Sequence, residues 1–123
     1  MNELIQSIFT DFEVDGVGIP VSYMYYNGHD NAYAVYMQTD ADASYSGDDD
    51  LLGYVDYYDF DIYSKGNYSK IIRAVKNRLK DNGFVFQPSR TSSDMYETET
   101  GYYHKTLSFA IFNTEDDRPP ASI

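Results

Sequence analysis

One stretch, residues 51–83, constrains the fold more than any other part of the chain. Tyr58, Phe60 and Ile62 alternate with polar neighbours, which is the period of a strand with one buried and one wet face. After a short turn, apolar residues recur at the spacing of one helix face: Ile71, Ile72, Val75 and Leu79. Gly83 is placed to end that helix. A strand and a helix joined so closely are expected to pack on each other.

The remaining elements are predicted to fit around this unit. We expect a first helix over residues 1–12. A strand pair over 21–26 and 32–39 is expected to form a hairpin, either with a tight turn at Asn27-Gly28 or with a five-residue loop over 27–31. Short strands are predicted at 84–86 and near Met95, and a last strand over 103–112 presents Leu107, Phe109 and Ile111 to the core. The order α-β-β-β-α-β-(β)-β predicts an α+β fold. It has a mixed, mostly antiparallel sheet of four to six strands, with two helices packed on one face.

The chain length of 123 residues fits one domain, which we place at residues 1–113. Residues 40–50 are acidic and without apolar periodicity, so they are expected to form a mobile acidic loop. Residues 114–123 are expected to form an acidic, proline-containing C-terminal tail.

Charge and composition exclude several classes of protein. A formal charge of −11 lacks the basic footprint of a nucleic-acid binder and disfavours an anionic membrane surface. The absence of cysteine excludes disulfides and thiolate chemistry, and no apolar run is long enough to span a bilayer. The sequence therefore predicts a soluble intracellular protein. Its 14 tyrosines indicate either an interface or simply a tyrosine-rich antiparallel sheet.

The cations are concentrated in the central helix. It holds most of the basic residues, and with the acidic loop it supplies the candidate subunit or partner contacts: Asp48, Asp49, Asp50, Lys70, Arg73, Lys76, Arg78 and Lys80. One interpretation is a solvated helix face with ion pairs to neighbouring carboxylates. The other is head-to-tail association, in which the basic helix meets an acidic surface of the next copy.

The loop from Asp40 is a candidate calcium site, because its oxygen-bearing side chains resemble the ligand series of a calcium-binding loop. Tyr45 stands where that series needs glycine and Leu51 where it needs glutamate, so a solvated acidic loop is the favoured interpretation.

The histidines and the paired aspartates do not complete a site either. His29 and His104 lack metal-ligand spacing with any partner, and Asp59 and Asp61 lack a third group, which favours surface roles for all of them. We therefore predict no catalytic residue, metal or cofactor, and a protein that is not an enzyme.

The order of these pieces resembles the tail terminator proteins of long, non-contractile-tailed bacteriophages, especially those of Gram-positive hosts. The resemblance covers residues 1–113. After the first helix it is carried by Ile19-Pro20-Val21, Asn27-Gly28, Tyr58-Asp-Phe-Asp-Ile-Tyr-Ser-Lys65, Ile71-Ile-Arg-Ala-Val-Lys-Asn-Arg-Leu79, Gly83-Phe84, Tyr96, Glu97-Thr-Glu99, Tyr102-Tyr-His-Lys105 and Phe109.

The resemblance implies a structural virion protein at the tail-neck junction, assembled in the host cytoplasm. Six copies would form a ring that caps the tail tube, ends tube polymerisation and docks the head-side connector or stopper protein. DNA would pass through the ring without specific binding. An alternative from a different class is an acidic DNA mimic that inhibits a host nucleic-acid-binding protein.

Overall fold

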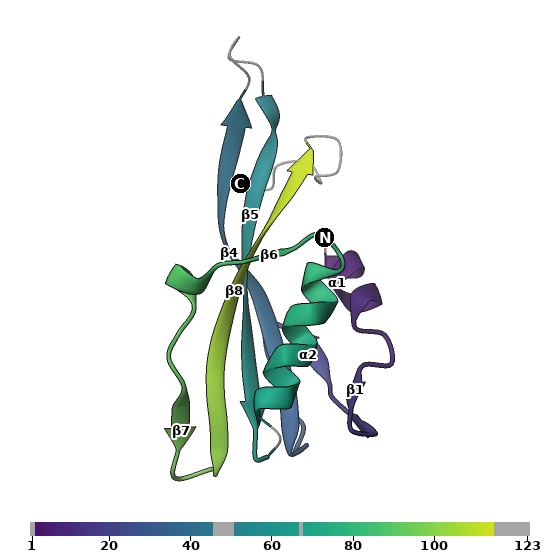
Figure 1. The fold of residues 1–123 in the computed structure, drawn as a ribbon, viewed down its shortest axis with the longest axis vertical. Helices are drawn as coiled ribbons and strands as arrows, with labels where there is room; N and C mark the ends of the chain where they lie inside the picture. Colours follow the sequence, from purple (N-terminus) through teal and green to yellow (C-terminus); the bar gives the residue numbers. More distant parts are fainter. Residues whose placement is uncertain (1, 46–50, 67, 115–123) are drawn as a thin grey trace.

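The structure, a computed structural model, describes residues 2–45, 51–66 and 68–114 (Figure 1). A six-stranded sheet runs in the order β3-β4-β5-β8-β6, and β7 also pairs with β8. The sheet strands are β3 (Val21–Tyr23), β4 (Ala32–Tyr45), β5 (Leu51–Ser64), β6 (Val85–Phe86), β7 (Met95–Glu97) and β8 (Tyr102–Thr114). Helices α1 (Asn2–Ile8) and α2 (Tyr68–Lys80), the hairpin β1 (Glu13–Val14) and β2 (Val17–Gly18), and the 3-10 turn η1 (Pro88–Arg90) complete the fold. The predicted α+β class is confirmed.

Both helices lie on one side of the sheet, as predicted (Figure 1). Phe60 and Ile62 of β5 and Leu107 of β8 are fully buried in the same core as Ile5 of α1 and Val75 of α2. Directly paired residues share a face, so the register Phe60↔Leu107 places the core residues of both strands under the helices. Alternation along β5 then directs the odd-numbered residues away from the helices.

Helix α2 ends as the sequence predicts, and the geometry shows how. Gly83 has φ +89°, a left-handed conformation that glycine adopts without strain. The Phe84 N–H donates to the Leu79 carbonyl at 3.0 Å and the Gly83 N–H to the Lys80 carbonyl at 3.2 Å, which is a Schellman cap. Phe84 and Leu79 also join the core, so the cap fixes where the chain leaves the helix.

The predicted hairpin between residues 21–26 and 32–39 is wrong. Strand β3 pairs with β4 in parallel, with Val21 opposite Ala34 and Tyr23 opposite Tyr36. Strand β3 stops at Tyr23 because Met24 takes φ 73° and the Tyr25 N–H donates to the Tyr23 carbonyl, which closes a tight γ-turn. The following residues carry the chain back to the start of β4, so Asn27-Gly28 is not a hairpin turn.

The expected mobile loop at residues 40–50 is also wrong in its first half. Residues 40–45 belong to β4 and pair with β5 as far as Tyr45 opposite Leu51, after a register shift between Gln38 and Asp40. Because this end of the hairpin extends past the helices, its side chains are exposed on both faces and show no alternation (Figure 1). Residues 46–50, including Asp48, Asp49 and Asp50, lie outside the described part of the chain.

The first helix is shorter than predicted. It ends at Ile8, and Asp11 takes φ 54° before the chain enters β1. Phe9 and Phe12 remain buried with their rings edge to face at 5.1 Å, so the apolar spacing marks core residues beyond the helix itself. A two-residue turn at Asp15-Gly16, both with positive φ, then joins β1 to β2.

Candidate interaction surface

The sheet has one face that no described helix or strand covers, opposite α1 and α2; we call it the open face. Register and alternation place these strand residues on it: Tyr33, Met37, Asp40 and Asp42 of β4, Tyr57, Asp59, Asp61 and Tyr63 of β5, and His104, Thr106 and Ser108 of β8. Most are half-buried, because tall side chains shield their neighbours and because Tyr26 and Arg90 lie against Tyr33 and Tyr57.

A row of stacked rings crosses the open face at one end. Tyr26 stacks on Tyr33 at 4.5 Å between ring centroids, Tyr33 on Tyr63 at 4.8 Å, and Tyr63 on His104 at 4.2 Å. We call these four residues the tyrosine row. Tyr102 meets Tyr33 edge-on at 5.6 Å, and its hydroxyl donates to the Asp30 carbonyl at 2.7 Å. Because the rings cover one another's faces, the row presents ring edges and hydroxyl groups to solvent.

The phenols of the row hold their protons more tightly than free tyrosine. Burial raises the pKa of Tyr33, and burial followed by the nearby Asp61 charge raises the pKa of Tyr63 to about 12. For Tyr26, the hydrogen bond that its hydroxyl donates to Asp30 is the main cause of a raised pKa. These hydroxyls are therefore neutral at physiological pH and act as hydrogen-bonding groups.

Carboxylates occupy the middle of the open face. Ser108 Oγ donates to Asp59 Oδ1 and Thr106 Oγ1 to Asp61 Oδ1, both at 2.6 Å. These neutral donors orient the two carboxylates without removing their charge. Asp59 and Asp61 thus share a face, as expected from their spacing, and the structure assigns each a hydroxyl partner on β8.

One cation already lies on this face. The Arg90 guanidinium is 4.0 Å from the centroid of the Tyr57 ring, and its Nη2 is 3.8 Å from Asp40 Oδ2. The contact combines a cation–π interaction with a long ion pair. It follows that the open face has a geometry in which a guanidinium fits between a tyrosine ring and a carboxylate.

The predicted basic residues of α2 separate into two groups. Three have partners within the fold. Lys70 Nζ is 3.1 Å from Asp15 Oδ2, Lys76 Nζ is 4.1 Å from the Phe86 ring centroid, and Arg78 donates to the Ile8 carbonyl at 2.7 Å. Arg73 and Lys80 are exposed and have no ion pair with any described residue. Within the described part of the chain, Arg73 and Lys80 are thus the two cations of α2 that lack such a partner.

The calcium hypothesis finds no support in the described residues. Asp40 and Asp42 lie on an extended strand, where alternate side chains are about 7 Å apart. Ser46 and Asp48 are outside the described residues. Across residues 2–45, 51–66 and 68–114, no group of three or more acidic, histidine or cysteine side chains is placed to hold a metal ion.

His104 has a buried polar atom without a hydrogen-bond partner among the described residues. This atom is Nε2, whereas Nδ1 lies 3.9 Å from Glu97 Oε2. The His104 ring stacks on that of Tyr63, which is the contact that holds it in the row.

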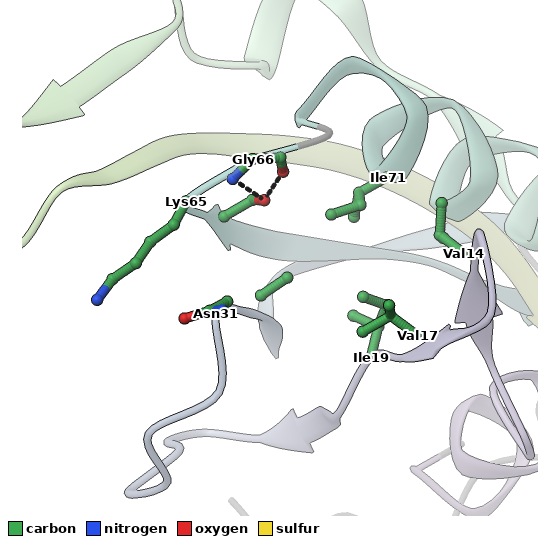
Figure 2. A pocket seen from close by; sticks show the side chains of 9 residues that line it. Val14, Val17, Ile19, Asn31, Lys65, Gly66 and Ile71 are labelled. Carbon is green, nitrogen blue, oxygen red and sulfur yellow. Dashed lines mark hydrogen bonds between the residues drawn. The ribbon is translucent and has the colours of Figure 1, made fainter.

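A pocket of about 310 Å³ lies on the helix side of the sheet, opposite the open face, between the β1–β2 hairpin and the start of α2 (Figure 2). Val14, Val17, Ile19 and Ile71 form its apolar wall. Ser64 Oγ accepts a hydrogen bond from the Gly66 N–H at 3.0 Å and donates to the Gly66 carbonyl, so the polar groups at its edge bind each other. Figure 2 shows Lys65 extending away from the apolar side chains. Asn31 is the remaining polar residue of a lining that is otherwise mainly apolar.

No protein-family model matches the chain, and no curated protein matches it. No helix among the described residues is long and apolar enough to cross a bilayer.

Proposed function

We propose that this protein is a structural subunit of a bacteriophage tail, the terminator that forms a ring on the end of the tail tube. The ring would end tube polymerisation and present the interface for the head-side connector or stopper protein. This is the function that the sequence resemblance implies. It requires a protein that acts through its surfaces and not through a catalytic site, and we propose that it is not an enzyme.

The half-covered sheet is the observation that supports the proposal most. A solvated sheet face normally carries short polar side chains, whereas the open face carries a row of tyrosines flanked by carboxylates. Tyrosine is enriched at protein interfaces because its ring packs while its hydroxyl forms hydrogen bonds. A surface of this composition fits contact with another protein.

Ring formation also fits the unlike sides of the protomer. The exposed side of α2 is basic at Arg73 and Lys80, and the open face is acidic at Asp42, Asp59 and Asp61. Contacts between unlike surfaces generate closed rings when the rotation between copies closes. In a ring of six copies, the net charge of −11 on each chain would repel the phosphates of DNA, which fits passage of DNA without binding.

The test is mass in solution, measured by light scattering after size exclusion, with and without purified tail tubes, together with electron microscopy. A sixfold mass with a central hole supports the proposal. A monomer that caps tube ends supports it equally, because the ring then closes on its template. A monomer that ignores tube ends refutes it. In that event the DNA-mimic alternative becomes testable by binding to basic nucleic-acid-binding proteins.

A further inference from the structure

We propose that the open face of one copy receives the exposed side of α2 from the next copy, with Arg73 and Lys80 directed at its carboxylates. The inference rests on the proposed ring and goes further, because it names the two surfaces that meet. The tail tube and the connector would then bind elsewhere on the protomer.

The receiving surface is defined by carboxylates that lack cationic partners. Asp59 and Asp61 accept hydrogen bonds only from Ser108 and Thr106 among the contacts that the structure shows. Asp42 is exposed, lies opposite Val55 on the same face, and forms no ion pair with a described residue. The phenols of Tyr33 and Tyr63, next to Asp61 on this face, are neutral, so the surface is negative and can accept hydrogen bonds as well as donate them.

The donating surface is the outer side of α2. Ile71, Val75 and Leu79 face the core, which directs Arg73 and Lys80 away from the sheet. Both side chains end in exposed cations, whereas Lys70, Lys76 and Arg78 are held by contacts within the fold. The two surfaces are therefore opposite in charge and lie on opposite sides of the same sheet.

Arg90 shows within one chain the contact that we propose between chains. Its guanidinium sits on the Tyr57 ring at 4.0 Å and beside Asp40 at 3.8 Å, on the open face itself. Lys65 lies over the Tyr102 ring at 4.9 Å at the end of the tyrosine row. Two cations of the same chain therefore already contact this face. Asp59 and Asp61 lie between these contacts and can pair with cations of another copy.

The placement of the two surfaces determines the symmetry of the contact. A symmetric pair would bring α2 to α2 or open face to open face, and each arrangement opposes like charges. A head-to-tail contact brings unlike charges together at every junction. It also leaves one free surface of each kind at the ends of an incomplete assembly, so growth continues until the ring closes.

Site-directed crosslinking tests the contact, because the chain contains no cysteine. Arg73→Cys provides a thiol on α2, and Asp42→Cys or Met37→Cys provides one on the open face. Each single variant, and each mixture of a helix variant with a sheet variant, is treated with a short bis-maleimide, in solution and on tail tubes. Glu99→Cys, on the turn between β7 and β8, is the matched exposed control. Thermal melting confirms that every variant is folded.

We expect a covalent dimer in mixtures of the Arg73 variant with either sheet variant, and at least tenfold less from each single variant or from the Glu99 control. Crosslinking of the Arg73 variant to itself would show a symmetric contact and overturn the inference. Absence of crosslinks while the protein caps tubes would overturn the inference and leave the proposed function standing. Absence of both crosslinks and caps would refute both proposals.

A charge exchange provides a second test that does not depend on the distance between thiols. Arg73→Glu with Lys80→Glu disables the helix side, and Asp42→Lys with Asp61→Lys disables the open face. Each variant alone should lose assembly, because like charges then meet at every junction. A mixture of the two should regain assembly with alternating copies, because each intact surface meets an intact partner and each reversed surface meets a reversed partner. Arg73→Lys with Lys80→Arg keeps the charge and should assemble. Unchanged assembly of the reversed variants would contradict the contact.

Discussion

Tyr63 lies in the middle of the tyrosine row, and burial raises the pKa of its phenol to about 12 from a usual value of 10.0. Between these values the unfolded chain releases a proton that the folded chain keeps. The contribution of Tyr63 to the free energy of unfolding is therefore complete below pH 10 and is lost as pH rises toward 12.

Tyr63→Phe should remove this part of the alkaline loss while it preserves the stacking on Tyr33 and His104. Urea unfolding at pH 8, 10, 11 and 12 measures the effect. We expect similar stability of both proteins at pH 8 and a shallower decline for the variant above pH 10, because Tyr63 no longer titrates. Parallel curves for the two proteins would show that Tyr63 does not account for the decline.

Asp56 is a buried carboxylate, 3% exposed, on the side of β5 that faces the core. Asn113 Nδ2 donates to its Oδ2 at 2.6 Å, and Gln38 Nε2 donates to its Oδ1 at 3.3 Å. Asn113→Ala removes the shorter of these two bonds, and we expect it to lower the free energy of unfolding by about 1–3 kcal/mol. Urea denaturation measures the change. Asn77→Ala, exposed on α2, is the control and should stay within about 0.5 kcal/mol.

At the scale of elements, the C-terminal cap of α2 stabilises the unit of β5 and α2 around which the rest of the chain packs. A side chain at Gly83 would meet no atom within 4 Å, so the cost of Gly83→Ala comes from its φ of +89° alone. We expect a loss of about 1–2 kcal/mol in the free energy of unfolding, measured by urea denaturation. Gly18→Ala is the control, since Gly18 has open space and no positive φ, and it should be close to neutral. Equal losses at both positions would argue against the cap as the cause.

The elements that depend on local signals were predictable from the sequence. Strand β5, helix α2 and its cap follow from alternation, helical spacing and one glycine, all within residues 51–83. The parallel pairing of β3 was not predictable in this way, because Asn27-Gly28 favours a hairpin and only the γ-turn at Met24 excludes it. The extension of β4 past Gln38 was hidden because both of its faces are exposed there.

The open face was predictable only in part. Alternation in β5 places Asp59, Asp61 and Tyr63 on one face, and the structure confirms that they share it. The tyrosine row is different, because Tyr33 and His104 join Tyr63 only through the registers of β4–β5 and β5–β8. Registers between distant strands depend on the whole core, and no local signal in the sequence determines them. The basic side of α2 was visible from spacing, but the contacts that occupy Lys76 and Arg78 were not.

At the scale of the whole molecule, the protomer has two unlike sides. One sheet separates a basic helix surface from an acidic, tyrosine-rich surface, and the buried apolar residues of both helices pack in the core between these surfaces. Because these two surfaces lie on opposite sides of the protomer, copies can add head to tail in one direction until a ring closes.

Assembly through these sides should weaken as salt is added. The screening length falls from about 10 Å at 0.1 M salt to about 3 Å at 1 M, and exposed ion pairs contribute about 0.2–1 kcal/mol each. For two cations per junction we expect roughly fivefold weaker association at 1 M salt. Light scattering across a salt series, at fixed protein concentration, measures the change.

The choice of salt in this series distinguishes a charged contact between copies from an apolar contact. Contacts through exposed apolar side chains, such as Tyr25 and Met24 at the β3 edge, would hold or strengthen in 1 M sulfate, because sulfate favours apolar burial. Sodium chloride and sodium sulfate at equal ionic strength should therefore weaken a charged junction alike. If sulfate restores the mass that chloride removes, the copies meet through apolar surface, and the helix-to-sheet junction is not the contact that closes the ring.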